Sequence, residues 1–215
     1  MKTIHGLENF PVNEASIVTI GTFDGVHLGH QQILKQLTDT SRKSKLKSVL
    51  LTFFPHPRMV LQPDIPMRLI QTIQEREKVL EKTGLDYLVI HPFSTAFSRL
   101  SADNYVKQIL VEQLNVRKVV VGYDHRFGRN RTASLEDMYH YADIYDFEVI
   151  EINAKKIDST AVSSTKIRKA IDDGNIELAN TYLGHSFTIE GIVVHGDKRG
   201  RELYYPTANI DLQNQ

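Results

Sequence analysis

Two histidines stand where an apolar run passes through a glycine-rich turn into a predicted helix. The segment is TIGTFDGVHLGH, over Thr19–His30. The unpaired N–H groups at the start of a helix attract anions, and His27 and His30, three residues apart, can donate hydrogen bonds to phosphate oxygens. The pattern predicts a phosphate site. Two alternative interpretations are histidines that are merely solvated in a tight turn, and a metal site with Asp24 as a further ligand.

Hydroxyl and basic groups open a second predicted helix. The run is VSSTKIR, over Val162–Arg168. Ser and Thr at a helix N-terminus, with Lys166 and Arg168 close behind, form a compact site for a polyphosphate. Capping of the helix would explain one of the serines, but it would not explain the whole run.

Two further segments follow predicted strands. In TFFPHP, over Thr52–Pro57, two prolines stiffen a loop, and the phenylalanines offer flat apolar surface for a ring system. Phe53 is equally suited to the core. In VGYDHRFG, over Val121–Gly128, and in the residues after it, three arginines indicate either a solvated basic loop or a phosphate contact.

The composition limits the chemistry. The 215 residues contain no Cys, which excludes thiolate nucleophiles and Cys-ligated metals, and 26 basic residues balance 26 acidic ones. Without a global positive charge, no nucleic-acid partner is indicated. No apolar run approaches the roughly 20 residues of a membrane span, and the first residues lack the pattern of a secretory signal. We therefore expect a cytoplasmic protein that binds small molecules, with no membrane partner.

The elements that must position these residues alternate between strands and helices. Helical spacing follows His30, recurs over Ile73–Thr83, and recurs after Ser101, which resembles a helix N-cap. This alternation predicts an α/β fold with a doubly wound parallel sheet, which binds ligands at the carboxyl ends of its strands. The predicted strands are Ser16–Ile20, Ser48–Phe53, Tyr87–His91, Lys118–Gly122 and Phe147–Ile152.

The character of the sequence changes near Gly184. Two short helices are predicted over Ser164–Ile171 and Ile176–Leu183, and Phe187–His195 then alternates like a strand. The roughly 30 residues from 185 onward are too few for an independent core. This tail should dock on the first domain, remain mobile, or be a fragment of something longer.

Taken in order, these segments resemble the prokaryotic bifunctional riboflavin kinase/FMN adenylyltransferase family, the FAD synthetases. The resemblance implies a Rossmann-like nucleotidyltransferase fold with an H-x-G-H signature, followed by the first strands of an incomplete β-barrel. It implies transfer of AMP from ATP to FMN, with Mg²⁺, to give FAD and pyrophosphate. The implied domains are an adenylyltransferase over residues 1–184 and the beginning of a riboflavin kinase over residues 185–215.

The resemblance also implies roles for individual residues. The expected catalytic residues are His27, His30, Ser164, Thr165 and Arg168. The expected nucleotide-binding and flavin-binding residues are Gly21, Thr22, Phe23, Asp24, Gly25, Pro55, Pro57, Gly122, Asp124, Phe127 and Ser163. Thr207 and Asn209, in the segment PTAN, match the magnesium ligands of the kinase.

The chain departs from the family pattern in two places. His125 stands where the family has Phe, with an altered loop over Arg129–Ala133, and Tyr204-Tyr205 replaces the usual residues before PTAN. The catalytic carboxylate of the kinase and most of its barrel are absent before Gln215, so kinase activity is not expected in these 215 residues. Two other functions stay open: another H-x-G-H adenylyltransferase or cytidylyltransferase, and a flavin-binding or nucleotide-binding regulatory protein without catalysis.

Overall fold

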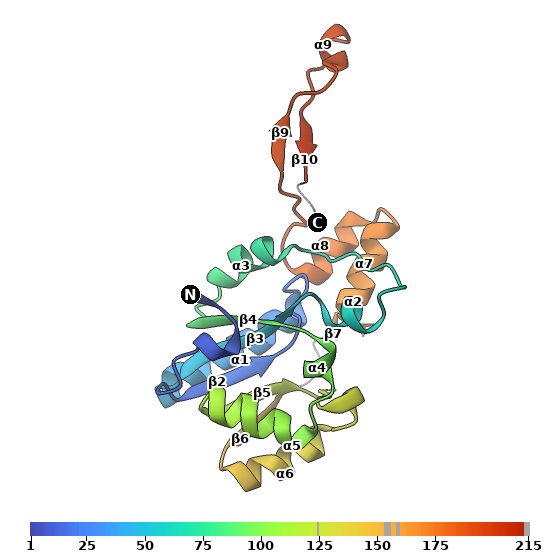
Figure 1. Cartoon of the computed structure of the whole chain (residues 1–215). Helices are drawn as coiled ribbons and strands as arrows, with labels where there is room; N and C mark the ends of the chain where they lie inside the picture. Colours follow the sequence, from blue (N-terminus) through green and yellow to red (C-terminus); the bar gives the residue numbers. More distant parts are fainter. Residues whose placement is uncertain (124, 153–155, 158–159, 213–215) are drawn as a thin grey trace.

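A six-stranded sheet lies at the centre of the computed structural model (Figure 1). The structure describes residues 1–123, 125–152, 156–157 and 160–212. All neighbouring strands are parallel, in the order β1-β4-β3-β2-β5-β6. The strands are β1 (Lys2–His5), β2 (Ser16–Ile20), β3 (Lys47–Phe54), β4 (Tyr87–Pro92), β5 (Val116–Gly122) and β6 (Glu148–Ile152). The predicted parallel sheet is confirmed, with β1 as an additional edge strand.

Helices cover both faces of the sheet, which is why its central strands are mostly apolar. Successive residues of a strand point to opposite faces, so Leu50 packs into one buried cluster and Leu51 into the other. One face is covered by α1 (Leu28–Ser44) and α3 (Ile73–Glu81), whose apolar residues join Leu50. The other face is covered by η1 (Leu7–Asn9), η2 (Tyr105–Gln113) and α6 (Leu135–Tyr145).

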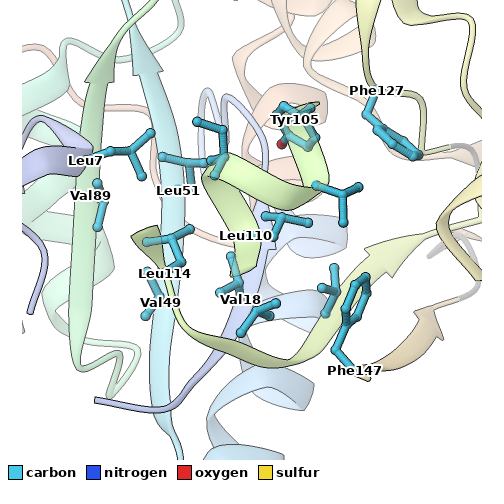
Figure 2. Close-up of a cluster of buried hydrophobic side chains, with 14 of the residues drawn as sticks. Leu7, Val18, Val49, Leu51, Val89, Tyr105, Leu110, Leu114, Phe127 and Phe147 are labelled. Carbon is cyan, nitrogen blue, oxygen red and sulfur yellow. The ribbon is translucent and has the colours of Figure 1, made fainter. Parts of the chain in front are cut away.

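The larger cluster lies beneath η2. Figure 2 shows Leu110 and Leu114 together with Val18 and Val49 of the sheet. The predicted N-cap is confirmed, because Ser101 Oγ accepts a hydrogen bond from the Asn104 amide at 3.1 Å, at the start of α5 (Ala102–Asn104). The helix then winds more loosely than an α-helix over Tyr105–Gln113, as a π-helix.

The direction in which the chain adds strands reverses between β2 and β5. It runs from β2 to β3 and β4 on one side, and then from β5 to β6 on the other. In open parallel sheets, ligands bind at the carboxyl ends of the strands beside such a reversal. The loop that contains His27 leaves β2 at this point, so the fold places it where the doubly wound architecture predicts a site.

Two helices and a projecting hairpin complete the structure. The predicted helices are confirmed as α7 (Ser164–Asp172) and α8 (Ile176–Leu183). Beyond them, β9 (Ile192–Val194) and β10 (Asn209–Asp211) form an antiparallel pair that extends away from the sheet with α9 (Arg199–Glu202) at its tip (Figure 1). The remaining short elements are α2 (Pro57–Leu61), α4 (Thr95–Ser98), η3 (Arg129–Arg131), β7 (Lys156–Ile157) and β8 (Thr160–Ala161).

The predicted strand over Phe187–His195 is correct only for its last part. Before β9, side chains of other elements bind the backbone of this segment. Asn180 accepts a hydrogen bond from the Phe187 amide at 2.6 Å, and Glu75 accepts one from the Glu190 amide at 3.1 Å. The segment therefore docks on α8 and α3 before the hairpin begins. Among the described residues, no helix is both long enough and apolar enough to cross a membrane.

Candidate functional site

One buried carboxylate, that of Asp24, connects the β2–α1 loop, residues 21–27, to other parts of the chain. Asp24 is fully buried, and its oxygens accept hydrogen bonds from the amides of Ile70 and Gln71 at 3.1 to 3.2 Å. The same carboxylate pairs with Arg76 at 3.4 Å and with Arg168 at 2.7 Å. Asp24 thus joins the loop to the start of α3 and to α7.

Three rings are stacked at the entrance to α1. The His27 and His30 centroids lie 3.6 Å apart, and the Phe23 ring stacks on His30 at 4.4 Å. His27 is the N-cap of α1, and its Nδ1 accepts a hydrogen bond from the His30 amide at 3.3 Å. Because Nδ1 is the acceptor, we infer that the His27 proton is on Nε2. His27 can therefore donate a hydrogen bond through Nε2.

Both histidines are neutral at pH 7. Burial lowers the pKa of His27 from 6.5 to about 4, although the nearby Asp24 opposes this effect. Burial, followed by the charges of His27 and Arg76, lowers the pKa of His30 well below 6.5. Nδ1 of His30 is buried without a hydrogen-bond partner among the described residues. Both histidines can therefore bind an anion as neutral hydrogen-bond donors.

The backbone of this segment tolerates little change. Phe23 and Val26 adopt positive φ angles of 49° and 39°, which large side chains seldom adopt and which store strain. A Cβ atom at Gly29 would lie 3.2 Å from the His27 ring. A larger residue at this position would therefore have to displace the His27 ring by a few tenths of an ångström.

The first turn of α7 lies against the β2–α1 loop. Ser163 is the N-cap and accepts a hydrogen bond from the Lys166 amide at 3.4 Å. Ser164 donates to the backbone carbonyl of Asp24 at 2.9 Å, and one turn later Arg168 reaches the Asp24 carboxylate. The two motifs predicted to bind phosphate, 140 residues apart, therefore meet at Asp24, and Thr165 of the same turn is exposed.

Arg76 completes this arrangement from α3. It is 2% exposed, and it donates to the Thr22 carbonyl at 2.7 Å as well as to Asp24. Burial lowers the pKa of Arg76, and Asp24 opposes that shift. Removing one member of a buried ion pair leaves the other charge without compensation, which costs about 3 to 5 kcal/mol. The network is therefore a structural support of the loop.

The loop after β3 approaches the same network. The pKa of His56, between Pro55 and Pro57, is lowered to about 4, mainly by burial and further by the positive charges of Arg168, Arg76 and Arg58. His56 Nδ1 accepts a hydrogen bond from the Arg58 amide at 3.1 Å and so caps α2. The predicted proline loop leads into Arg58, which lines one pocket together with Arg168 of the Asp24 network.

The other predicted site residues occupy three kinds of position. Gly21 and Thr22 follow β2, Gly25 has a φ of 83°, and Gly122 ends β5. Phe23 and Phe127 are 2% and 5% exposed, and each belongs to a buried hydrophobic cluster. Thr207 and Asn209 are exposed on the projecting hairpin. Asp124 lies outside the described residues.

Sequence reasoning missed Arg76 and did not foresee the role of Asp24 as a buried partner of two arginines. A signal for Arg76 was present: it lies three residues after Ile73 and four before Leu80, on the apolar face of the predicted helix. A charged residue on such a face needs a buried partner. No comparable local signal exists for Asp24, because its partners come from distant parts of the chain.

Comparisons with known proteins identify related sequences along the whole chain. The family model described as FAD synthetase matches residues 10–166, and the one described as riboflavin kinase matches residues 183–215. Proteins named bifunctional riboflavin kinase/FMN adenylyltransferase are 40% identical in Buchnera aphidicola subsp. Schizaphis graminum and 35% identical in Escherichia coli K12. These alignments cover 99% and 100% of this chain, and 69% of each relative.

A solved structure shows the same fold over the whole chain. It is a crystal structure of a protein from Streptococcus pneumoniae named a macrolide-efflux protein, with 33% sequence identity and a TM-score of 0.88. The match covers 100% of this chain and 70% of that one. Since the first family model spans most of the chain, and since alignments over nearly the whole of this chain exceed 30% identity, the chain belongs to the FAD synthetase family.

Proposed function

We propose that this chain is an FMN adenylyltransferase, which transfers AMP from ATP to FMN and releases pyrophosphate. The observation that carries the proposal is the meeting of the H-x-G-H helix start and the first turn of α7 at Asp24. Two helix N-termini, two histidines and an arginine suit one polyphosphate. Membership of the FAD synthetase family supports FMN as the acceptor.

In the proposed reaction, a phosphate oxygen of FMN attacks the α-phosphorus of ATP in line. A new P–O bond forms, and the bond between the α-phosphorus and its bridging oxygen breaks, with the electron pair leaving on pyrophosphate. The FMN phosphate is already anionic, so no general base is needed. Catalysis then depends on positioning and on stabilising charge.

The histidines act on the α-phosphate in this proposal. His27 donates through Nε2, and His30 lies 3.6 Å away in the stack, at the start of α1. Ser164, Thr165 and Arg168 bind the β- and γ-phosphates. Because donors that act mainly in the transition state are each worth about 10²- to 10³-fold in rate, the paired histidines are expected to supply a large part of the catalysis.

The flavin is proposed to bind at the loops after β3 and β5. Pro55 and Pro57, with Gly122, Asp124 and Phe127, are the residues assigned to it. In this structure Phe127 stacks with His125 at 5.9 Å and lies 5.7 Å from the Tyr105 ring, so it forms an aromatic wall between the core and this loop. Gly21, Thr22, Phe23, Gly25 and Ser163 are proposed to position the nucleotide through their backbone.

Mg²⁺ fits this site as a partner of ATP. Among the described residues, no group of three His, Cys, Asp or Glu side chains could hold a metal ion. Magnesium commonly keeps several waters and is bound by substrate phosphates and few protein groups. When bound, it would neutralise phosphate charge. On the hairpin, Thr207 and Asn209 are proposed as a remnant magnesium site of the kinase, beside the closely packed Gly200 and Gly196.

We further propose residues 1–184 as the transferase domain and residues 185–215 as the beginning of a riboflavin kinase domain. The riboflavin kinase match begins at residue 183, which supports this boundary. The hairpin carries no buried residue among those described. For this 215-residue chain, phosphorylation of riboflavin is not expected.

One experiment separates the possible functions. The purified chain is incubated with FMN, ATP and Mg²⁺, and the flavins are separated by chromatography. Formation of FAD is the expected result. Binding of FMN without turnover would instead support a regulatory protein, and a complete lack of interaction with flavin would contradict the proposal. Replacing FMN by riboflavin tests the kinase in the same assay.

A further inference from the structure

A second group of arginines lies beside the proposed site. A cavity of about 420 Å³ is lined by Arg58, Pro66, Met67, Arg68, Arg168 and Asp172, and we call it the arginine cavity. Arg58 belongs to α2, Arg68 to the segment before α3, and Arg168 to α7. Three separate parts of the chain therefore each contribute an arginine to the lining of one cavity.

The charges in the arginine cavity are unbalanced. Its three arginines face one lining carboxylate, Asp172, which pairs with Arg68 at 3.9 Å while both side chains are largely exposed. Arg58 donates to the neutral side chain of Gln62 at 3.2 Å. Arg168 is matched by Asp24 on its other side. The cavity therefore carries an excess of positive charge that suits a multiply charged anion.

The position of the cavity continues the proposed phosphate site. Arg168 belongs both to the arginine cavity and to the Asp24 network beneath the β2–α1 loop. His56, two residues before Arg58, accepts a hydrogen bond from the Arg58 amide through Nδ1 at 3.1 Å, so the proline loop leads directly into the cavity lining. An anion bound by His27 and His30 and extended past Arg168 would enter the cavity. Planar guanidinium groups match phosphate oxygens in a bidentate geometry.

We propose that Arg58 and Arg68 bind the β- and γ-phosphates of ATP together with Arg168, and hold the pyrophosphate group as it leaves. This inference rests on the proposed function and adds two substrate-binding residues to it. When the bond to the α-phosphorus breaks, negative charge grows on the departing pyrophosphate, and the two arginines lie where they would stabilise that charge. Asp172 opposes binding, because its carboxylate competes for Arg68.

The first test is direct binding, measured by calorimetry on the full 215-residue chain. The ligands are magnesium pyrophosphate and AMP, which lacks the two outer phosphates. Arg58→Gln and Arg68→Gln should each weaken pyrophosphate binding about three- to tenfold, the range for exposed charge-assisted contacts. AMP binding should not change. Arg117→Gln is the matched control, because Arg117 lies near the start of β5, at the opposite end of the strand from the site.

A third variant is expected to change pyrophosphate binding in the opposite direction. Asp172→Asn removes the competing carboxylate and should tighten pyrophosphate binding by about two- to threefold. In the FAD assay, the two arginine variants should raise the KM for ATP and leave the KM for FMN unchanged. Since both arginines are exposed, their loss should not prevent folding.

The outcomes separate this inference from the proposed function. Unchanged pyrophosphate binding in both arginine variants, or equal weakening of AMP and pyrophosphate, would overturn the inference even if FAD is formed. If the unmodified chain forms no FAD, the proposed function fails. The pyrophosphate measurements would then still show whether the arginine cavity binds an anion.

Discussion

The β2–α1 loop and the C-terminal hairpin both carry segments typical of phosphate or metal binding, but their surroundings differ. Around the loop, Asp24 and Arg76 are buried and every oxygen of the carboxylate is hydrogen-bonded. On the hairpin, Val193 is 69% exposed and Tyr204 is 92% exposed. The first segment is therefore supported by a core and a charge network, whereas the hairpin has no buried residue over the part that the structure describes. A binding motif needs such support to be preorganised.

The largest expected effect comes from removing the charge at the centre of the supported region. Asp24→Asn leaves Arg76 and Arg168 without their counter-charge, so the free energy of unfolding should fall by about 3 to 5 kcal/mol. Urea denaturation followed by circular dichroism measures it. The matched variant on the hairpin is Asp197→Asn, whose exposed pair with Arg199 at 3.0 Å should contribute under about 1 kcal/mol. If both variants lost the same free energy of unfolding, the loop and the hairpin would not differ in the way that we propose.

A histidine in each region gives the next test. His30→Ala should lower the rate of FAD formation by about 10²-fold or more, because it removes a donor at the reacting phosphates. His195→Ala changes an exposed histidine of the hairpin and should leave that rate unaltered. Initial rates at saturating ATP and FMN measure both. Wild-type turnover of a folded His30→Ala protein would remove His30 from the mechanism.

The buried histidines also predict how stability depends on pH. The pKa of His27 is about 4 in the folded state against 6.5 in the unfolded chain, so between these values the unfolded state binds more protons. The contribution of neutral His27 to the free energy of unfolding is complete above pH 6.5. As the pH falls toward 4, about 3 kcal/mol of this free energy is lost. Urea denaturation at a series of pH values should show this loss. His27→Gln should show a flatter curve, and an unchanged slope would argue against the buried neutral form.

The smallest effect is expected at the tip of the hairpin. Tyr204 is 92% exposed, so Tyr204→Ser should change the free energy of unfolding by less than about 0.5 kcal/mol. Thermal unfolding of the unmodified chain and of the Tyr204→Ser variant measures this difference in stability. A clear loss of stability would show that the hairpin packs against something in solution, and the contrast with the β2–α1 loop would then be smaller than the structure indicates.

The sequence predicted the elements whose signal is local. Val49, Leu50 and Leu51 form an unbroken apolar run because β3 is buried on both faces, and such runs are easily recognised. β1 was missed because its four residues, KTIH, form a short and mostly polar edge strand. The start of α1 was located correctly because histidine and glycine spacing is visible without any tertiary contact.

The network beneath the site could not be predicted in the same way. Asp24 meets the amide of Ile70, 46 residues away, and the side chain of Arg168, 144 residues away. The residues near Asp24 in the sequence therefore do not indicate which residues it contacts. The arginine cavity has the same origin, since Arg58, Arg68 and Arg168 are brought together only when α7 packs beside the loop after β3.

The pairing of one carboxylate with two arginines also restricts how this protein can evolve. Replacing Asp24 by a neutral residue leaves two guanidinium groups unmatched, and replacing one arginine leaves the other to balance the carboxylate alone. Substitutions at contacting charges are not additive, so an acceptable change at one position depends on the residues at the other two. We therefore expect positions 24, 76 and 168 to be inherited as a unit across descendants of this sequence, while exposed positions of the hairpin drift independently.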